Sequence, residues 1–278
     1  MTTFAARLDQ ACSANRSLVC VGLDVDPDRL PISDVLEFNR AIIDATADLV
    51  CAYKPNLGFY EALGLPGLKA LEGTVEHIRN TAPGVIIIGD AKRGDIGSTA
   101  RAYAKAMFQV WGFDVVTVNA WGGQDTLEPY LEDPEHGVFI WCRGSNPGSA
   151  DLQDLEVVSP AGNVPLYRHL AQVATTWNRN DNVGLVMGAT SPEQLAGIRD
   201  VCGDMPLLIP GVGAQGGDLE AAVRLGTDRQ GRRAVINSSR GILYASSGPD
   251  FAQAARRETA ALRDAINQVL EAEGKGWP

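Results

Sequence analysis

Three charged residues stand close together directly after a strongly apolar run of the sequence. Residues 85–88 read VIII, and Asp90, Lys92 and Asp95 follow them. A run of β-branched residues is typical of a buried strand, and an unpaired charge at the end of such a strand is costly. Side chains two positions apart point to the same face of a strand, so we expect Asp90 and Lys92 to lie side by side. Opposite charges so placed indicate either a structural ion pair or a site for acid–base chemistry.

Polar residues also follow other apolar runs of the chain. They are Asp24, Lys54, Asn56, Arg143, Ser145, Pro210, Gln215, Ser239 and Arg240. Single members of this set have simpler explanations, because an isolated Lys54 is by default a surface lysine whose stem packs on apolar surface. Asp95 is equally well explained as the N-cap of the next helix. A shared site therefore requires a fold that brings the ends of these runs together.

Short apolar runs alternate with amphipathic segments along the whole chain. The amphipathic segments include 34–50, 99–112, 218–226 and 250–274, and the eight apolar runs are 18–23, 50–55, 85–90, 115–119, 137–142, 183–188, 206–211 and 234–239. Strands that alternate with helices predict parallel βαβ units, and eight units in 278 residues predict one (β/α)8 barrel domain, a TIM barrel, over 1–278. The alternative is a doubly wound open sheet, which usually has fewer strands.

A barrel of this kind carries its catalytic groups at the carboxyl ends of its strands. The loops after the seventh and eighth strands often bind phosphate there. In this sequence those loops read PGVGAQGGD and NSSRGILYAS. Glycines allow close approach of the backbone, although they also occur in ordinary turns, and Arg240 can hold a phosphate bidentately. The segment 144–163 after the fifth strand is expected to be a long irregular loop, of a length typical of lids.

Composition narrows the classes of function. The formal net charge of −10 argues against non-specific binding of nucleic acid. The five cysteines are scattered, which indicates free thiols in a reducing compartment and neither a disulfide framework nor a zinc site. The first residues lack the pattern of a signal peptide, and no run of 18 apolar residues occurs, so no membrane segment is expected. We therefore expect a soluble, cytoplasmic protein.

The polar residues also resemble the motifs of a known family, orotidine 5′-phosphate decarboxylase. The segment DAKRGDIGSTA at 90–100 is similar to the family signature D-x-K-x-x-D-I-x-x-T. The other matching segments are GLDVD (22–26), YKPN (53–56), RGSNPG (143–148), PGVGAQGGD (210–218) and SSRGI (238–242). They run nearly end to end in the order of the family, and SSRGI and SNPG are most similar to its longer bacterial subgroup.

The resemblance implies a homodimeric barrel that acts on a nucleotide. It implies decarboxylation of orotidine 5′-monophosphate to uridine 5′-monophosphate and CO2, in the biosynthesis of UMP, without metal or organic cofactor. Loss of CO2 leaves a localised carbanion at C6. In the implied mechanism Lys92 stabilises that charge and donates a proton to C6, while the neighbouring carboxylates keep Lys92 protonated.

The resemblance also implies a role for each matching residue. The catalytic charged array would consist of Lys54, Asp90, Lys92 and Asp95. Asp95, Ile96 and Thr99 would reach the site of the partner subunit. Asp24 and Lys54 would bind ribose hydroxyls, and Ser145 would meet the pyrimidine. Gln215, Ser239 and Arg240 would line the phosphate, with Pro210 nearby. Ser239 stands where many members have glycine, a difference that a backbone N–H contact tolerates.

Two other functions are compatible with these residues. A related sugar-phosphate decarboxylase or hexulose-phosphate synthase would use Mg²⁺ to stabilise an enediolate. The segments Lys54-Pro55-Asn56 and Ser145-Asn146-Pro147 favour the nucleotide enzyme instead. A non-catalytic sensor of nucleotide phosphates on the same barrel is the second alternative, and the complete charged signature argues against it.

Overall fold

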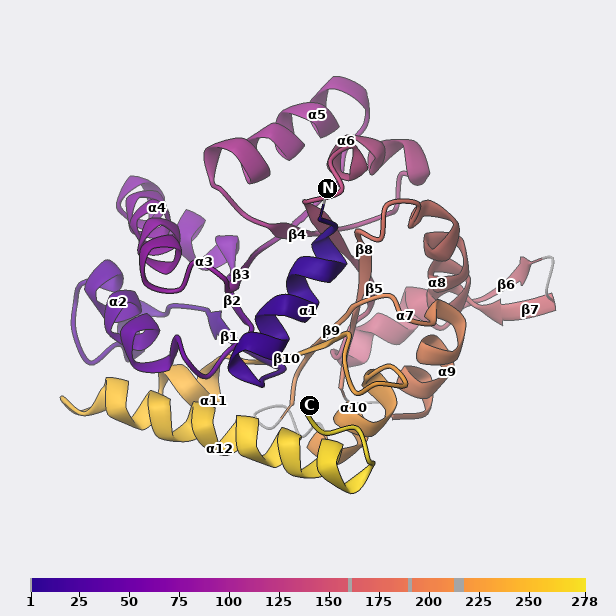
Figure 1. The fold of residues 1–278 in the computed structure, drawn as a ribbon. Helices are drawn as coiled ribbons and strands as arrows, with labels where there is room; N and C mark the ends of the chain where they lie inside the picture. The colour runs from indigo at the N-terminus through magenta and orange to yellow at the C-terminus, as the bar shows by residue number, and fades with distance from the viewer. Residues whose placement is uncertain (1, 160–161, 190–191, 213–217) are drawn as a thin grey trace.

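Eight parallel strands close into a barrel in the computed structural model (Figure 1). The structure describes residues 2–159, 162–189, 192–212 and 218–278. The barrel strands are β1 (Val19–Leu23), β2 (Ala52–Pro55), β3 (Ile86–Arg93), β4 (Val115–Val118), β5 (Gly137–Arg143), β8 (Val183–Met187), β9 (Leu207–Pro210) and β10 (Ala234–Ser238). Their order around the barrel is β1-β10-β9-β8-β5-β4-β3-β2. Each corresponds to one of the eight apolar runs, so the predicted (β/α)8 fold is confirmed.

Helices surround the barrel and cover the outer faces of its strands. They are α2 (Val35–Thr46), α3 (Leu57–Ala62), α4 (Gly64–Thr81), α5 (Gly97–Lys105), α6 (Glu128–Leu131), α8 (Leu166–Trp177), α9 (Pro192–Cys202), α10 (Leu219–Gly226), α11 (Arg240–Leu243) and α12 (Phe251–Ala272), with short turns η1 (Pro27–Arg29), η2 (Ala106–Val110) and η3 (Gln124–Thr126). Aspartate side chains cap two of them, Asp34 on α2 and Asp218 on α10. No helix in the described part of the chain is both long and apolar enough to cross a membrane.

An additional helix, α1 (Phe4–Asn15), precedes the barrel and was not expected from the sequence. It lies against the amino ends of the strands. Phe4 packs edge-on against Phe139 of β5, with ring centroids 5.8 Å apart. Arg7 and Arg79 both pair with the buried carboxylate of Asp114, which precedes β4. The helix therefore covers the end of the barrel opposite to the predicted site.

The segment 144–163 is more regular than the sequence indicated. It contains the turn η4 (Pro147–Ser149), the short helix α7 (Ala150–Gln153) and strand β6 (Glu156–Ser159). Strand β6 pairs antiparallel with β7 (Gly162–Pro165), and the hairpin projects from the body of the barrel (Figure 1). The expectation of an irregular loop is wrong here, because strands of four residues are too short to give a clear periodic pattern.

Candidate active site

A cavity of about 250 Å³ lies at the carboxyl ends of the barrel strands. Its lining comes from loops and strand ends that are far apart in the sequence. Of the residues singled out in the sequence, it contains Asp24, Lys54, Asn56, Asp90, Lys92, Arg143, Ser145, Pro210, Ser239 and Arg240. Gln215 lies outside the described residues. The barrel thus brings most of the predicted set to one rim.

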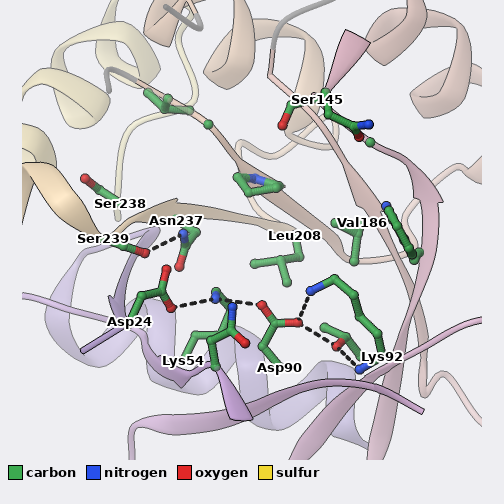
Figure 2. A pocket seen from close by; sticks show the side chains of 18 of the residues that line it. Asp24, Lys54, Asp90, Lys92, Ser145, Val186, Leu208, Asn237, Ser238 and Ser239 are labelled. Carbon is green, nitrogen blue, oxygen red and sulfur yellow. Dashed lines mark hydrogen bonds and ion pairs between the residues drawn. The ribbon is translucent and has the colours of Figure 1, made fainter. Parts of the chain in front are cut away.

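Four charged side chains form a continuous chain along one wall of the cavity (Figure 2). The Nζ of Lys54 donates to Asp90 Oδ2 at 2.9 Å and lies 3.5 Å from Asp24 Oδ1. The Nζ of Lys92 donates to Asp90 Oδ1 at 2.6 Å. Signs alternate along this chain from Asp24 through Lys54 and Asp90 to Lys92. Each charge therefore has a neighbour of opposite sign, as a group of partly buried charges requires.

Burial and charge act in opposite directions on the two central groups. Burial alone would lower the pKa of Lys54, but the charges of Asp24 and Asp90 outweigh it and raise that pKa above its ordinary value. Burial alone would raise the pKa of Asp90, but Lys54 and Lys92 outweigh it and hold that pKa well below its usual range. Lys54 is therefore an ammonium and Asp90 a carboxylate throughout the neutral range.

A bulge in β3 sets the direction of Lys92. The register between β3 and β4 shifts between Gly89 and Arg93, and Lys92 has a backbone φ of +45°. Its N–H donates to Thr117 Oγ1 at 2.9 Å. Simple alternation predicted that Asp90 and Lys92 lie together, and they do. The contact arises from this irregular backbone, however, because strict alternation ends at the bulge.

Asp95, Ile96 and Thr99 do not line the cavity of this chain. All three are exposed. The carboxylate of Asp95 accepts a hydrogen bond from the N–H of Ile96 at 2.7 Å. The N-cap of α5 is Ile96, and no side chain caps this helix. The alternative interpretation of Asp95 as a helix cap is therefore wrong.

The cavity lining also includes Pro210, Ser239 and Arg240. A Cβ at Gly22 would lie 1.9 Å from Ser239 Oγ, so only glycine there leaves room for this serine side chain. Arg240 is exposed at the rim. Its side chain makes no hydrogen bond or ion pair with the described part of the chain, in contrast to that of Arg143, which also lines the cavity. An unpaired guanidinium at this position can bind an anion.

Sequence reasoning missed two polar residues of the cavity, Thr117 and Asn237. Thr117 donates to Asp90 Oδ1 at 2.8 Å, so it is a third partner of that carboxylate. Asn237 lies near Ser239, with 3.4 Å between its Nδ2 and the serine Oγ. Each is a polar residue inside a β-branched run, near the end of a strand that was otherwise assigned as apolar. A polar residue near the end of an apolar strand was the signal that could have identified them from the sequence.

No cysteine is among the described residues that line the cavity. All five cysteines are buried and free, as predicted. Among the described residues, no group of three or more His, Cys, Asp or Glu side chains is arranged to hold a metal ion. The groups that line the cavity include two ammonium groups, two carboxylates, two guanidinium groups and several hydroxyl and amide groups.

Curated proteins are similar to this chain in sequence over nearly its whole length. A protein of Roseiflexus castenholzii named orotidine 5′-phosphate decarboxylase is 50% identical over 276 residues, covering 97% of this chain and 99% of its own. One of Ralstonia pickettii with the same name is 50% identical over 272 residues, covering 95% and 98%.

Solved structures give the same result. A putative orotidine-monophosphate decarboxylase of Toxoplasma gondii superposes with a TM-score of 0.87 at 38% identity, covering 98% of both chains. The OMP decarboxylase of Leishmania donovani gives 0.84 at 36% identity, covering 96% of this chain and 98% of its own. The model of the orotidine 5′-phosphate decarboxylase / HUMPS family matches residues 17–257. The chain belongs to this family.

Proposed function

We propose that the protein decarboxylates orotidine 5′-monophosphate to uridine 5′-monophosphate, with Lys92 as the proton donor to C6 and without a metal or organic cofactor. The observation that carries this proposal is the chain of alternating charges Asp24–Lys54–Asp90–Lys92 on the cavity wall. Relatives that are 50% identical over nearly the whole chain are named orotidine 5′-phosphate decarboxylase, which supports the same substrate.

The nucleotide spans the cavity from the charged wall to the rim that carries Arg240. Asp24 and Lys54 hold the ribose hydroxyls, and Ser145 faces the pyrimidine. Arg240 and Ser239 bind the phosphate beside Pro210, and we assign Gln215 to the same group from the resemblance alone. The unpaired state of Arg240 supports this orientation, because its donors are available to phosphate oxygens.

Decarboxylation breaks the bond between C6 and the carboxylate carbon. The bonding electron pair stays on C6, and CO2 leaves. The ammonium of Lys92 lies beside the developing negative charge and stabilises it without reorganisation. It then transfers one proton to C6, which completes uridine 5′-monophosphate and leaves a neutral amine. The side chain of Lys92 is 40% exposed, so solvent can return the proton after product release.

Asp90 and Lys54 prepare Lys92 for this step. Asp90 accepts hydrogen bonds from Lys54, Lys92 and Thr117. These contacts fix the carboxylate, and the fixed carboxylate in turn holds the Lys92 ammonium at 2.6 Å. Preorganised charges of this kind are the main source of transition-state stabilisation in many enzymes. Lys54 balances the charge of Asp90 from the other side.

We further propose that the active form is a homodimer in which Asp95, Ile96 and Thr99 complete the site of the partner subunit. In the single chain these residues lie outside the cavity, and Ile96 is 65% exposed although it is apolar. In the proposed dimer the partner subunit would cover this exposed isoleucine.

Turnover by the purified protein tests the proposal directly. Orotidine 5′-monophosphate is followed by its ultraviolet absorbance, in buffer with and without EDTA, and the product is identified by chromatography. We expect equal rates in both buffers and uridine 5′-monophosphate as the product. Absence of turnover would refute the decarboxylase activity. Turnover that EDTA abolishes would instead favour a metal-dependent reaction of the kind that related sugar-phosphate enzymes use.

A further inference from the structure

Two arginines line the cavity, and they differ in burial and in hydrogen bonding. Arg240 is exposed, and its guanidinium makes no hydrogen bond or ion pair with the described part of the chain. Arg143, the last residue of β5, is only 8% exposed. All three nitrogens of its guanidinium donate to protein acceptors. Arg143 therefore has little capacity left to bind a ligand, and its position at the site needs another explanation.

The acceptors of Arg143 belong to two separate parts of the chain. One is Gln194 on α9, whose Oε1 accepts from Nε at 3.2 Å. The others lie in the segment that follows β5 itself. They are Gly144 O at 3.2 Å, Ser149 Oγ, Gln153 Oε1 at 3.2 Å and Asp154 Oδ2 at 3.0 Å. One rigid fork thus ties the start of the 144–163 segment to α7 and to α9.

The contacts of Arg143 with these acceptors form a clamp, and Ser145 lies in the loop that this clamp holds. Gly144 N donates to Gln153 Oε1 at 2.8 Å, which closes the loop on the same glutamine that Arg143 binds. On the other side, a Cβ at Gly188 would lie 2.9 Å from Cα and Cβ of Ser145, so the serine packs directly on the end of β8. Gly188 N also donates to Arg143 O at 3.0 Å. The backbone of Ser145 is therefore held on both sides.

We infer that Arg143 is a positioning residue that acts through Ser145, by holding the 144–154 loop so that the serine faces the pyrimidine. The inference rests on the proposed function, since it assumes a nucleotide in the cavity. A displacement of about 1 Å in a residue that positions substrate can reduce the rate by a factor on the order of 10². Loss of the clamp therefore has a kinetic consequence and not only a structural one.

The substitution Arg143→Lys separates the effect of the forked guanidinium from the effect of its positive charge. Arg143→Lys keeps the ion pair with Asp154, but a single ammonium has three donors and cannot reach acceptors on α7 and α9 at once. We expect Arg143→Lys to lower kcat/KM for orotidine 5′-monophosphate by about tenfold or more. If lysine supports wild-type kinetics, charge alone suffices and the proposal is wrong.

A double-mutant cycle tests whether the effect passes through Ser145. The kinetics of wild type, Arg143→Lys, Ser145→Ala and the double variant are compared, together with their affinity for UMP. Residues that act through one another give non-additive effects. Once Ser145 is alanine, Arg143→Lys should change kcat/KM by no more than about twofold. Additive effects would overturn the proposal. A wild type without turnover or UMP binding would instead refute the proposed function itself.

Arg199 provides a matched control. It is also surrounded by acceptors, donating to the carbonyls of Gly203, Met205 and Gly226, but it does not line the cavity. Arg199→Lys should lower the melting temperature while leaving kcat/KM of the folded protein unchanged, with no coupling to Ser145→Ala. Equal kinetic losses from both lysine variants would mean that Arg143, too, acts only through stability, and would contradict the inference.

Discussion

Lys92 combines three properties that distinguish it from an ordinary surface lysine. Its backbone has a φ of +45° at a bulge, its ammonium lies 2.6 Å from Asp90, and its side chain is 40% exposed at the cavity. Positive φ in a residue other than glycine is strained, and such strain is concentrated at functional sites. The backbone therefore bears a cost that keeps this ammonium directed into the cavity.

Lys92→Ala should abolish nearly all turnover while the fold survives. The substitution removes the proton donor and the main cation together, and general acid catalysis alone contributes a factor of about 10² to 10⁴. The measurement is kcat/KM for orotidine 5′-monophosphate, with folding checked by circular dichroism. Lys69→Ala, an exposed lysine of α4, is the control and should be fully active. Activity of Lys92→Ala within about tenfold of the parent would contradict the assignment.

At the residue scale, much of the site could be predicted from the sequence, because charged residues after apolar runs are unusual enough to be noticed. Asp24, Lys54, Asp90 and Lys92 were all found in this way, and they meet at the cavity. Thr117 and Asn237 were not found. A single polar residue inside a strand gives no local signal of whether it faces the barrel interior or a helix, and only the closed barrel decides this.

At the element scale, the strands were predictable and the additions to the barrel were not. Strands buried on both faces read as continuous apolar runs, which are visible in one sequence. The hairpin β6–β7 and the helix α1 depend on contacts with distant segments. Phe4 of α1, for example, is held by Pro134 and by Phe139, more than a hundred residues away. Local patterns cannot reveal such contacts.

The contact between α1 and β5 gives a prediction about stability. A Cβ at Gly137 would lie 2.4 Å from the ring of Phe4, so Gly137→Ala must displace this ring and disturb the packing of α1 on β5. We expect a loss of about 1–3 kcal/mol in the free energy of unfolding, as overpacked sites show, measured by urea denaturation. The kcat/KM of the folded protein should not change, because this end of the barrel lies opposite the site.

Gly84→Ala is the matched control for that substitution. A Cβ at Gly84 would meet no atom within 4 Å, and its backbone φ is not in the left-handed region. This variant should unfold at the same urea concentration as the parent or slightly higher, since alanine restricts the unfolded chain more than glycine does. Equal destabilisation by both alanines would show that the packing of Phe4 is not the cause.

At the scale of the whole molecule, the barrel followed from the count of alternating strands and helices, but the assembly does not follow from composition or periodicity. The expectation of a shared site came from the family resemblance. It is consistent with the exposed Asp95, Ile96 and Thr99, which make no contact with the cavity of their own chain. In a dimer with a two-fold axis, each subunit would contribute these three residues to the site of the other.

Mixing two inactive variants tests this shared site. If Asp90 serves its own subunit and Asp95 serves the partner, Asp90→Ala and Asp95→Ala homodimers should both be nearly inactive. In a mixed dimer one site collects both substitutions and the other collects neither. With free exchange about half of the dimers are mixed, so activity should recover to about a quarter of the wild-type value.

Subunit exchange is verified independently with two affinity tags. If Asp95 completes the site of its own subunit, every site in the mixture lacks one carboxylate and no activity returns. That outcome would refute the shared site while leaving the proposed role of Lys92 intact.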